Sequence, residues 1–198
     1  MAEAVDLTPR MNRLAAAWQH QIIHGTALEQ TPNYTGLAVP GRFEKGYLGE
    51  LAFCALLVRE RKRFRYRARP NGKSNPSEID TSVRGRRCVV DVKTAGERHH
   101  KRLMFPNAQL HREGLSPPNA YAGVRLVDRD KAEIWGFLTR AEGSALPIGE
   151  FGHGVPTRHR LLADLRPIHD LLLVLDSAPP GSRVVCRRAP GYWEFSLS

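Results

Sequence analysis

Apolar residues recur at helical spacing in two stretches near the start of the chain. Leu14, Trp18 and Ile22 follow one another at four-residue intervals, which predicts a helix over residues 7–23. Residues 43–59 also place their apolar side chains about one turn apart. The pattern predicts a second helix there, with one face directed at a core.

Alternation of charged and apolar residues indicates the first strand. Every second position from 63 to 69 is basic, and the intervening positions are apolar: Arg63, Arg65, Arg67 and Arg69 alternate with Phe64, Tyr66 and Ala68. Period two predicts a strand with one basic face and one buried face. Such a row could follow a nucleic-acid backbone, or it could protect an edge strand from aggregation.

Further elements follow from the same patterns. Residues 78–83 and 87–93 form a predicted hairpin around Arg84-Gly85-Arg86. The remaining predicted elements are a helix over 103–112, a pair of strands over 121–127 and 132–138, a helix over 167–175, and a hairpin of 184–186 with 192–195.

This order of elements predicts a single α/β domain with a mixed sheet. The domain covers residues 41–198 and ends in a helical and irregular extension. Residues 1–40 are predicted to form a partly helical N-terminal arm, because the Pro- and Gly-containing stretch 25–41 separates them from the rest.

Charge is distributed unevenly along the 198 residues. The formal net charge is +10, and residues 59–102 hold 15 basic and 5 acidic residues, so this block carries the whole excess. Concentrated positive charge is typical of a partner with a phosphate backbone. A solvated basic face is the simpler alternative.

Composition excludes several classes of protein. The three cysteines are widely separated, so a disulfide framework is excluded and a reducing, cytoplasmic location is expected. The longest apolar run, residues 171–175, is too short to span a bilayer, and residues 1–10 show no secretory signal. No membrane partner is therefore expected.

The stretch around Asp91 carries the clearest chemical signal. Period two places Asp91 and Lys93 on one face of an apolar strand, where a charged pair is costly to bury without a partner. The predicted hairpin brings Asp80 close to Asp91, and Glu50 on the preceding helix offers a third carboxylate. Clustered carboxylates hold Mg²⁺, which lowers the pKa of a bound water and polarises a phosphoryl group.

These residues resemble the PD-(D/E)XK nuclease superfamily, whose signature is an acid followed by a strand ending in acid-x-Lys. The match consists of Asp80, then Asp91-Val92-Lys93, with Glu50 on the upstream helix, and it covers residues 43–138. The sequence departs from the pattern in two places. Ile79 precedes the first acid instead of Pro, and the second acid is Asp rather than the commoner Glu.

The resemblance implies a restriction-endonuclease-like core, in which a mixed central sheet of four to five strands is flanked by helices. It also implies a role for each matching residue. Asp80, Asp91 and Glu50 would hold Mg²⁺, with Mn²⁺ able to substitute, and the Val92 carbonyl would complete the shell. Lys93 would position the attacking water, and Gln109 matches a glutamine that family members carry on the next helix. Glu78 competes with Asp80, because alternation places both on one face.

Each candidate also has a purely structural interpretation. Asp91 and Lys93 would then form an ion pair at a sheet edge, and Asp80 would cap a turn. Glu50 would be a solvated helix residue, and Gln109 would be exposed or structural.

The sequence therefore predicts a Mg²⁺-dependent endonuclease acting on duplex or branched DNA, of the junction-resolving, repair or phage type. Cutting two strands favours a homodimer. The basic residues predicted to hold the DNA backbone are Arg63, Arg65, Arg67, Arg69, Lys73, Arg98, Lys101 and Arg102. A non-catalytic DNA-binding protein on the same fold and a metal-dependent ribonuclease are the alternatives.

Overall fold

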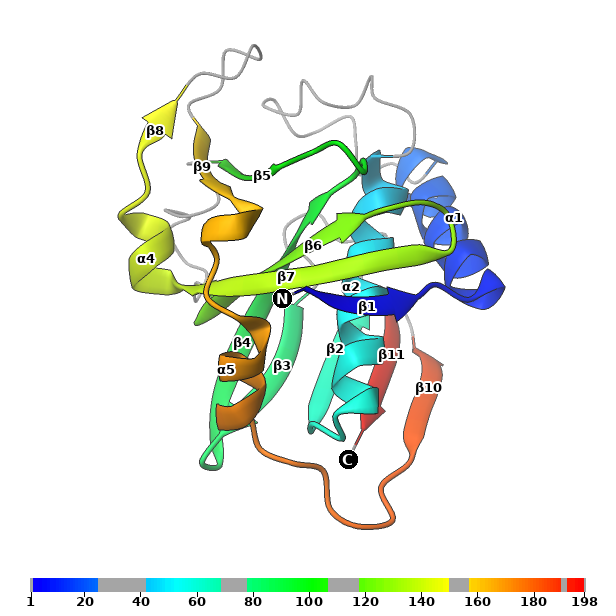
Figure 1. Ribbon diagram of the computed structural model, residues 1–198. Coiled ribbons are helices and arrows are strands. Elements are labelled where there is room, and N and C mark those ends of the chain that lie inside the picture. The colour runs from blue at the N-terminus through cyan, green and yellow to red at the C-terminus, as the bar shows by residue number, and fades with distance from the viewer. Residues whose placement is uncertain are drawn as a thin grey trace.

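A computed structural model describes residues 2–24, 42–68, 78–106, 118–149, 157–189 and 192–197. The protein is α/β, with a large mixed sheet of eight strands, a smaller sheet of three strands and a few helices (Figure 1). The strand order in the large sheet is β1-β7-β6-β4-β3-β2-β11-β10, and in the small sheet it is β5-β9-β8.

The large sheet is built from these strands: β1 (Glu3–Asp6), β2 (Phe64–Ala68), β3 (Glu78–Val83), β4 (Arg86–Ala95), β6 (Ala120–Leu126), β7 (Lys131–Thr139), β10 (Val184–Ala189) and β11 (Tyr192–Leu197). The small sheet comprises β5 (Arg102–Pro106), β8 (Ile148–Gly149) and β9 (Thr157–Leu161). The helices are α1 (Pro9–His24), α2 (Arg42–Arg59), α4 (Arg140–Ser144), the 3₁₀ helix η3 (Leu162–Asp164) and α5 (Ile168–Val174).

Most of the predicted elements are confirmed. Both N-terminal helices, the strand 64–68, the hairpin β3–β4, the strand pair β6–β7, helix α5 and the hairpin β10–β11 lie where the patterns place them. Phe64, Tyr66 and Ala68 are buried and Arg65 is exposed, as the alternation predicts.

The large sheet has more strands than the four to five predicted, because both ends of the chain extend it. We expected residues 1–40 to form an arm, but β1 pairs with β7 along one edge of the sheet. At the other edge, β11 pairs with β2, so the C-terminal hairpin continues the sheet instead of forming an irregular extension. The edges of a sheet are where segments remote in sequence add on by backbone hydrogen bonds.

The segment following β4 also differs from the prediction. Residues 102–106 form strand β5 rather than the start of a helix, and β5 pairs with β9, a strand that the sequence did not indicate. Leu103 and Phe105 point into a small core while Arg102 and Met104 are exposed, which is the period-two pattern of a strand. Gln109 lies outside the described residues.

The main core lies between helices α1 and α2 and one face of the large sheet. Trp18 of α1 is completely buried, and its ring lies 5.1 Å from that of Tyr47 and 6.3 Å from that of Tyr66. Helix α2 approaches β4 closely at Gly49, where any side chain would collide with Thr94. The two helices therefore cover a single face of the sheet, which we call the helix face.

A second, smaller core lies on the opposite face, which we call the outer face. Leu103 and Phe105 of β5 pack there with Tyr121 of β6 and Leu138 of β7. In Figure 1 the small sheet stands at one end of the molecule, and the hairpin β10–β11 stands at the other. The small core therefore covers only part of the outer face. It does not extend over the strands on the β10 side of the sheet.

The turn between β3 and β4 aligns the two strands that carry the candidate site. Arg84 and Gly85 both have positive φ, 51° and 76°, which matches a two-residue hairpin turn. The Asp176 carboxylate accepts a hydrogen bond from the backbone N–H of each, at 2.8 Å. This contact ties the hairpin to the segment that follows α5.

Candidate functional site

Asp91 and Lys93 form an ion pair on the outer face of β4. Their Oδ2 and Nζ atoms lie 2.8 Å apart, and the two side chains are 11% and 15% exposed. Val90 and Val92, which alternate with them, point to the helix face and belong to the main core. The shared face that the sequence predicts for Asp91 and Lys93 is confirmed.

Asp80 lies on the same outer face of the neighbouring strand. Asp80 is opposite Val89 in the antiparallel pair β3–β4, which makes it a diagonal neighbour of Asp91. Side chains in that relation are roughly 7–8 Å apart. Arg87 holds the Asp80 carboxylate, with Nη2 at 2.6 Å from Oδ1 and Nε at 2.7 Å from the same atom.

Tyr121 adds a hydroxyl that sequence reasoning missed. It lies opposite Asp91 in the parallel pair β4–β6. Burial and the nearby Asp91 carboxylate raise the pKa of Tyr121 to about 12, against a smaller opposing effect of Arg140. Residues 121–127 are recognisable as a strand, but no local pattern indicates that this strand pairs with the one carrying Asp91.

The backbone of β4 is oriented by Asn119. Its side-chain Oδ1 accepts from the Val89 N–H, and its own N–H donates to the Val89 carbonyl, both at 2.8 Å. Val89 thus directs its backbone groups toward β6, and alternation turns those of Val92 toward β3. The described pairs of β3 with β4 end at Ile79 and Val90, short of the Val92 carbonyl.

Glu50 does not join the other two acids. Its Oε2 accepts a hydrogen bond from the Tyr66 hydroxyl at 2.5 Å, and Tyr66 is fully buried on the helix face. Burial raises the pKa of Tyr66, and Glu50 raises it further. The sheet separates Glu50 from Asp80 and Asp91, so the predicted trio of carboxylates is not assembled. Within the described ranges, no three His, Cys, Asp or Glu side chains form a group that could hold a metal ion.

The predicted DNA-binding arginines of β2 meet a buried carboxylate. Glu194 of β11 is 3% exposed, and its carboxylate lies 3.1 Å from Arg67 Nε, 3.9 Å from Arg65 Nε and 2.5 Å from Arg187 Nη2. Burial acts to raise the pKa of Glu194, but hydrogen bonds from Arg67 and Arg187 outweigh it, so the pKa is lowered. One carboxylate therefore organises three guanidinium groups on the outer face.

The other predicted basic residues are divided among several places. Arg63 is exposed just before β2, whereas Arg69 and Lys73 lie outside the described residues. Arg98, Lys101 and Arg102 are exposed in and beside the turn between β4 and β5. The described members of this predicted set thus form two groups, one along β2 and one at the C-terminal end of β4.

A scan against protein-family models found no matching family, and searches of curated proteins and of solved structures found no match either. Nor does any helix in the described part of the chain have the length and apolar character needed to cross a membrane.

Proposed function

We propose that the protein is a Mg²⁺-dependent endonuclease of the PD-(D/E)XK type that cleaves DNA. The observation that carries this proposal is the Asp91–Lys93 pair, which is largely buried on the outer face of β4 next to Asp80. Burying such a pair is costly, and an apolar pair would stabilise the strand at least as well. A role in a reaction therefore explains the buried pair better than a role in stabilising the fold.

The order of elements supports the proposal. Helix α2, strand β2 and hairpin β3–β4 are followed along the chain by β6, which lies beside β4 in the sheet. This order is similar to the helix–strand–hairpin–helix–strand core of the family. The position of its second helix falls on β5 and on residues outside the described ranges.

The donor set fits a magnesium ion with two protein carboxylates. Mg²⁺ is commonly bound by one or two carboxylates and substrate phosphates while it keeps several waters. Asp80 and Asp91 would supply the carboxylates, and the Val92 carbonyl, directed toward the β3 side, would supply a third oxygen. The bound ion would lower the pKa of a water and polarise the phosphoryl oxygens.

The remaining side chains have separable roles. Lys93 carries a positive charge within 2.8 Å of Asp91, in position to orient a water and to stabilise negative charge developing on a phosphate. Tyr121 lies opposite Asp91, and its pKa, raised to about 12, favours the neutral hydroxyl, so Tyr121 would serve as a hydrogen-bond donor. Arg87 has to release Asp80 when the metal binds.

Cleavage of supercoiled plasmid and of branched DNA in Mg²⁺ tests the proposal. We expect Lys93→Ala and Asp91→Asn each to lower the cleavage rate by about 10²- to 10³-fold, the usual effect of removing an electrostatic catalytic group. Lys131→Ala and Asp128→Asn are the matched controls, because both residues lie at the exposed β6–β7 turn. Cleavage that persists in EDTA, or that both site variants retain, would contradict the proposal.

A non-catalytic DNA-binding protein is the second candidate, and one observation favours it. Asp80 is already neutralised by Arg87, and Glu50 lies on the other face of the sheet. In that case DNA would bind with steep salt dependence and no cleavage would occur in Mg²⁺ or Mn²⁺. The same plasmid experiment separates the two candidates.

A further inference from the structure

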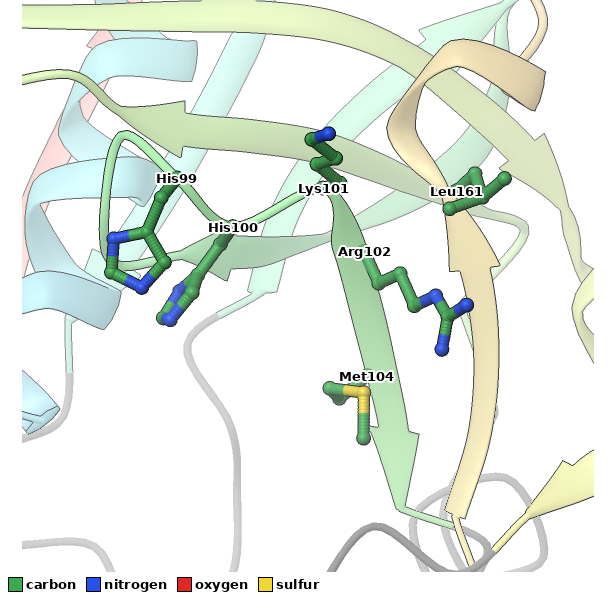
Figure 2. A pocket seen from close by; sticks show the side chains of 6 residues that line it. All are labelled: His99, His100, Lys101, Arg102, Met104 and Leu161. Atoms are coloured by element: carbon green, nitrogen blue, oxygen red, sulfur yellow. The ribbon is translucent and has the colours of Figure 1, made fainter.

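A pocket lies beside β5, away from the Asp91–Lys93 pair. Its volume is about 500 Å³, within the roughly 300–1,000 Å³ typical of small-molecule sites. Figure 2 shows its lining side chains, which are His99, His100, Lys101, Arg102, Met104 and Leu161. Four of the six are cationic or imidazole groups, and the other two are apolar.

Backbone pairing fixes the apolar wall. Arg102 lies opposite Leu161 in the pair β5–β9, and the Leu162 N–H donates to the Lys101 carbonyl at 2.8 Å. Because Leu103 and Phe105 fill the small core, alternation leaves Arg102 and Met104 on the open side. Met104 is 37% and Leu161 38% exposed, so both side chains are accessible to a ligand.

The polar wall is held by a turn that is anchored to α2. Glu97 forms an ion pair with Lys45 of α2, and the Glu97 carbonyl accepts from the His100 N–H at 3.0 Å. The one acidic side chain of this turn is therefore already compensated by a lysine outside the pocket. The rings of His99 and His100 lie 4.6 Å apart, and Lys101 and Arg102 follow directly.

We propose that this pocket binds one unpaired nucleotide of a DNA strand. Its phosphate would contact Arg102 and the imidazoles of His99 and His100, and its base would lie against Met104 and Leu161. The choice of DNA rests on the proposed nuclease function, which this inference sharpens to substrates that contain a single-stranded segment. A turn over residues 96–101 joins β4, with its Asp91–Lys93 pair, to β5.

The combination of walls distinguishes a nucleotide from other ligands. A free phosphate would use the cationic wall and gain nothing from the apolar one. A paired duplex would present its backbone while its bases remained stacked inside. Of these three ligands, the unpaired nucleotide alone offers a phosphate and an accessible base face together. The flexible thioether of Met104 adapts to any base, which suits recognition without sequence preference.

Fluorescence anisotropy tests the proposal, with a labelled single-stranded oligothymidylate and a blunt duplex as probes. The full chain is titrated in EDTA at several salt concentrations, so that binding is measured without cleavage. The variants are Arg102→Ala and Met104→Ala. Arg183→Ala is the control, because Arg183 is exposed in the segment before β10 and far from the pocket.

Arg102→Ala and Met104→Ala should change the affinity for the single strand in different ways. Arg102→Ala should weaken single-strand binding about tenfold and reduce the slope of log affinity against log salt by about 0.7, because one phosphate contact is lost. Met104→Ala should weaken it about threefold with an unchanged slope, because only apolar contact is lost. On the duplex, Met104→Ala should bind within about twofold of the wild type, as should Arg183→Ala with either probe. Arg102→Ala should lose less affinity for the duplex than for the single strand, because only the single strand can also use the apolar wall.

Three results would overturn the proposal. An effect of Arg102→Ala without one of Met104→Ala would show a site for phosphate only. Equal losses for the single strand and the duplex would show a general backbone contact, and losses no larger than that of Arg183→Ala would show no site. Because these titrations need no catalysis, pocket-dependent binding without cleavage in Mg²⁺ would contradict the nuclease proposal and retain the pocket.

Discussion

The two faces of the large sheet carry opposite chemistry along the same strand. Toward the helices, β4 presents Val90 and Val92, which are 0% and 7% exposed within an apolar core. Toward the other side it presents Arg87, Asp91 and Lys93, a series of charges of which the last two are largely buried. The helix face is therefore built for stability, and the outer face keeps groups that folding alone does not require.

Truncating the core on the helix face should produce the largest loss of stability. Trp18 is 0% exposed and contacts the rings of Tyr47, Tyr66 and Phe195. Trp18→Ala should lower the free energy of unfolding by about 3–5 kcal/mol in urea titrations, because it leaves a large cavity. Arg13→Ala on the exposed side of α1 should change it by less than about 0.5 kcal/mol. A small effect of Trp18→Ala would show that α1 is not part of the core.

Replacing the outer-face pair by apolar residues should have the opposite effect. The double variant Asp91→Leu with Lys93→Met should unfold at the same free energy as the wild type, or up to about 1–4 kcal/mol higher, because two charges no longer need desolvation. Its cleavage activity should vanish. Urea titration and plasmid cleavage on the same preparations measure both outcomes. A double variant that is strongly destabilised would identify the pair as structural.

Replacing Tyr66 tests whether Glu50 belongs to the core on the helix face or to the candidate active site. Tyr66→Phe removes the hydroxyl that donates to Glu50, which should lower the free energy of unfolding by about 1–3 kcal/mol, the value of a hydrogen bond to a charged group. Cleavage per folded molecule should be unchanged. Tyr192→Phe, in the C-terminal hairpin, should alter neither property. A loss of cleavage for Tyr66→Phe without a loss of stability would instead connect Glu50 to the active site.

Asp176 holds the turn between β3 and β4. Replacing it tests the register of these two strands, which decides the face of the sheet on which each side chain lies. Hydrogen bonds from the backbone N–H groups of Gly85 and Arg84 hold the pKa of Asp176 below its ordinary value of 3.8. The contribution of Asp176 to stability is thus present above about pH 4 and is lost as the pH falls through the lowered pKa.

Thermal unfolding across the acidic range measures this smallest effect. Asp176→Asn should unfold at a lower temperature than the wild type at pH 7, and the two midpoints should converge as Asp176 becomes protonated. Asp164→Asn, at an exposed position, should follow the wild type throughout. Midpoints of wild type and Asp176→Asn that differ equally at both extremes would show that the carboxylate charge is not involved.

Local pattern predicts most of the helices and strands, because each depends on neighbours in sequence. The alternation in 63–69 and the turn at Arg84-Gly85 suffice to predict β2 and the hairpin that brings Asp80 beside Asp91. The segment 102–106 was misassigned because its short alternation is also compatible with a helix that continues beyond it. A segment of five residues is a strand only if a partner such as β9 pairs with it.

Local pattern predicts only some of the residues of the candidate site. Asp91 and Lys93 share a face because period two requires it, whereas the position of Glu50 depends on how α2 is rotated against the sheet. Tyr121 enters only because β6 pairs in parallel with β4. The apolar stripe of a helix does not indicate which face of a sheet it covers, and the pairing of remote strands leaves no trace in a local pattern.

The sequence by itself determined most of the local elements, the acid-x-Lys strand and the confinement of the positive charge to one block, since these depend on residue type and spacing. Only the tertiary structure decided the eight-strand order, the placement of the described DNA-binding candidates in two groups and the separation of Glu50 from Asp80 and Asp91. The physical reason is that strand pairing and helix packing are set by the total burial of apolar surface, to which each local segment contributes only a part.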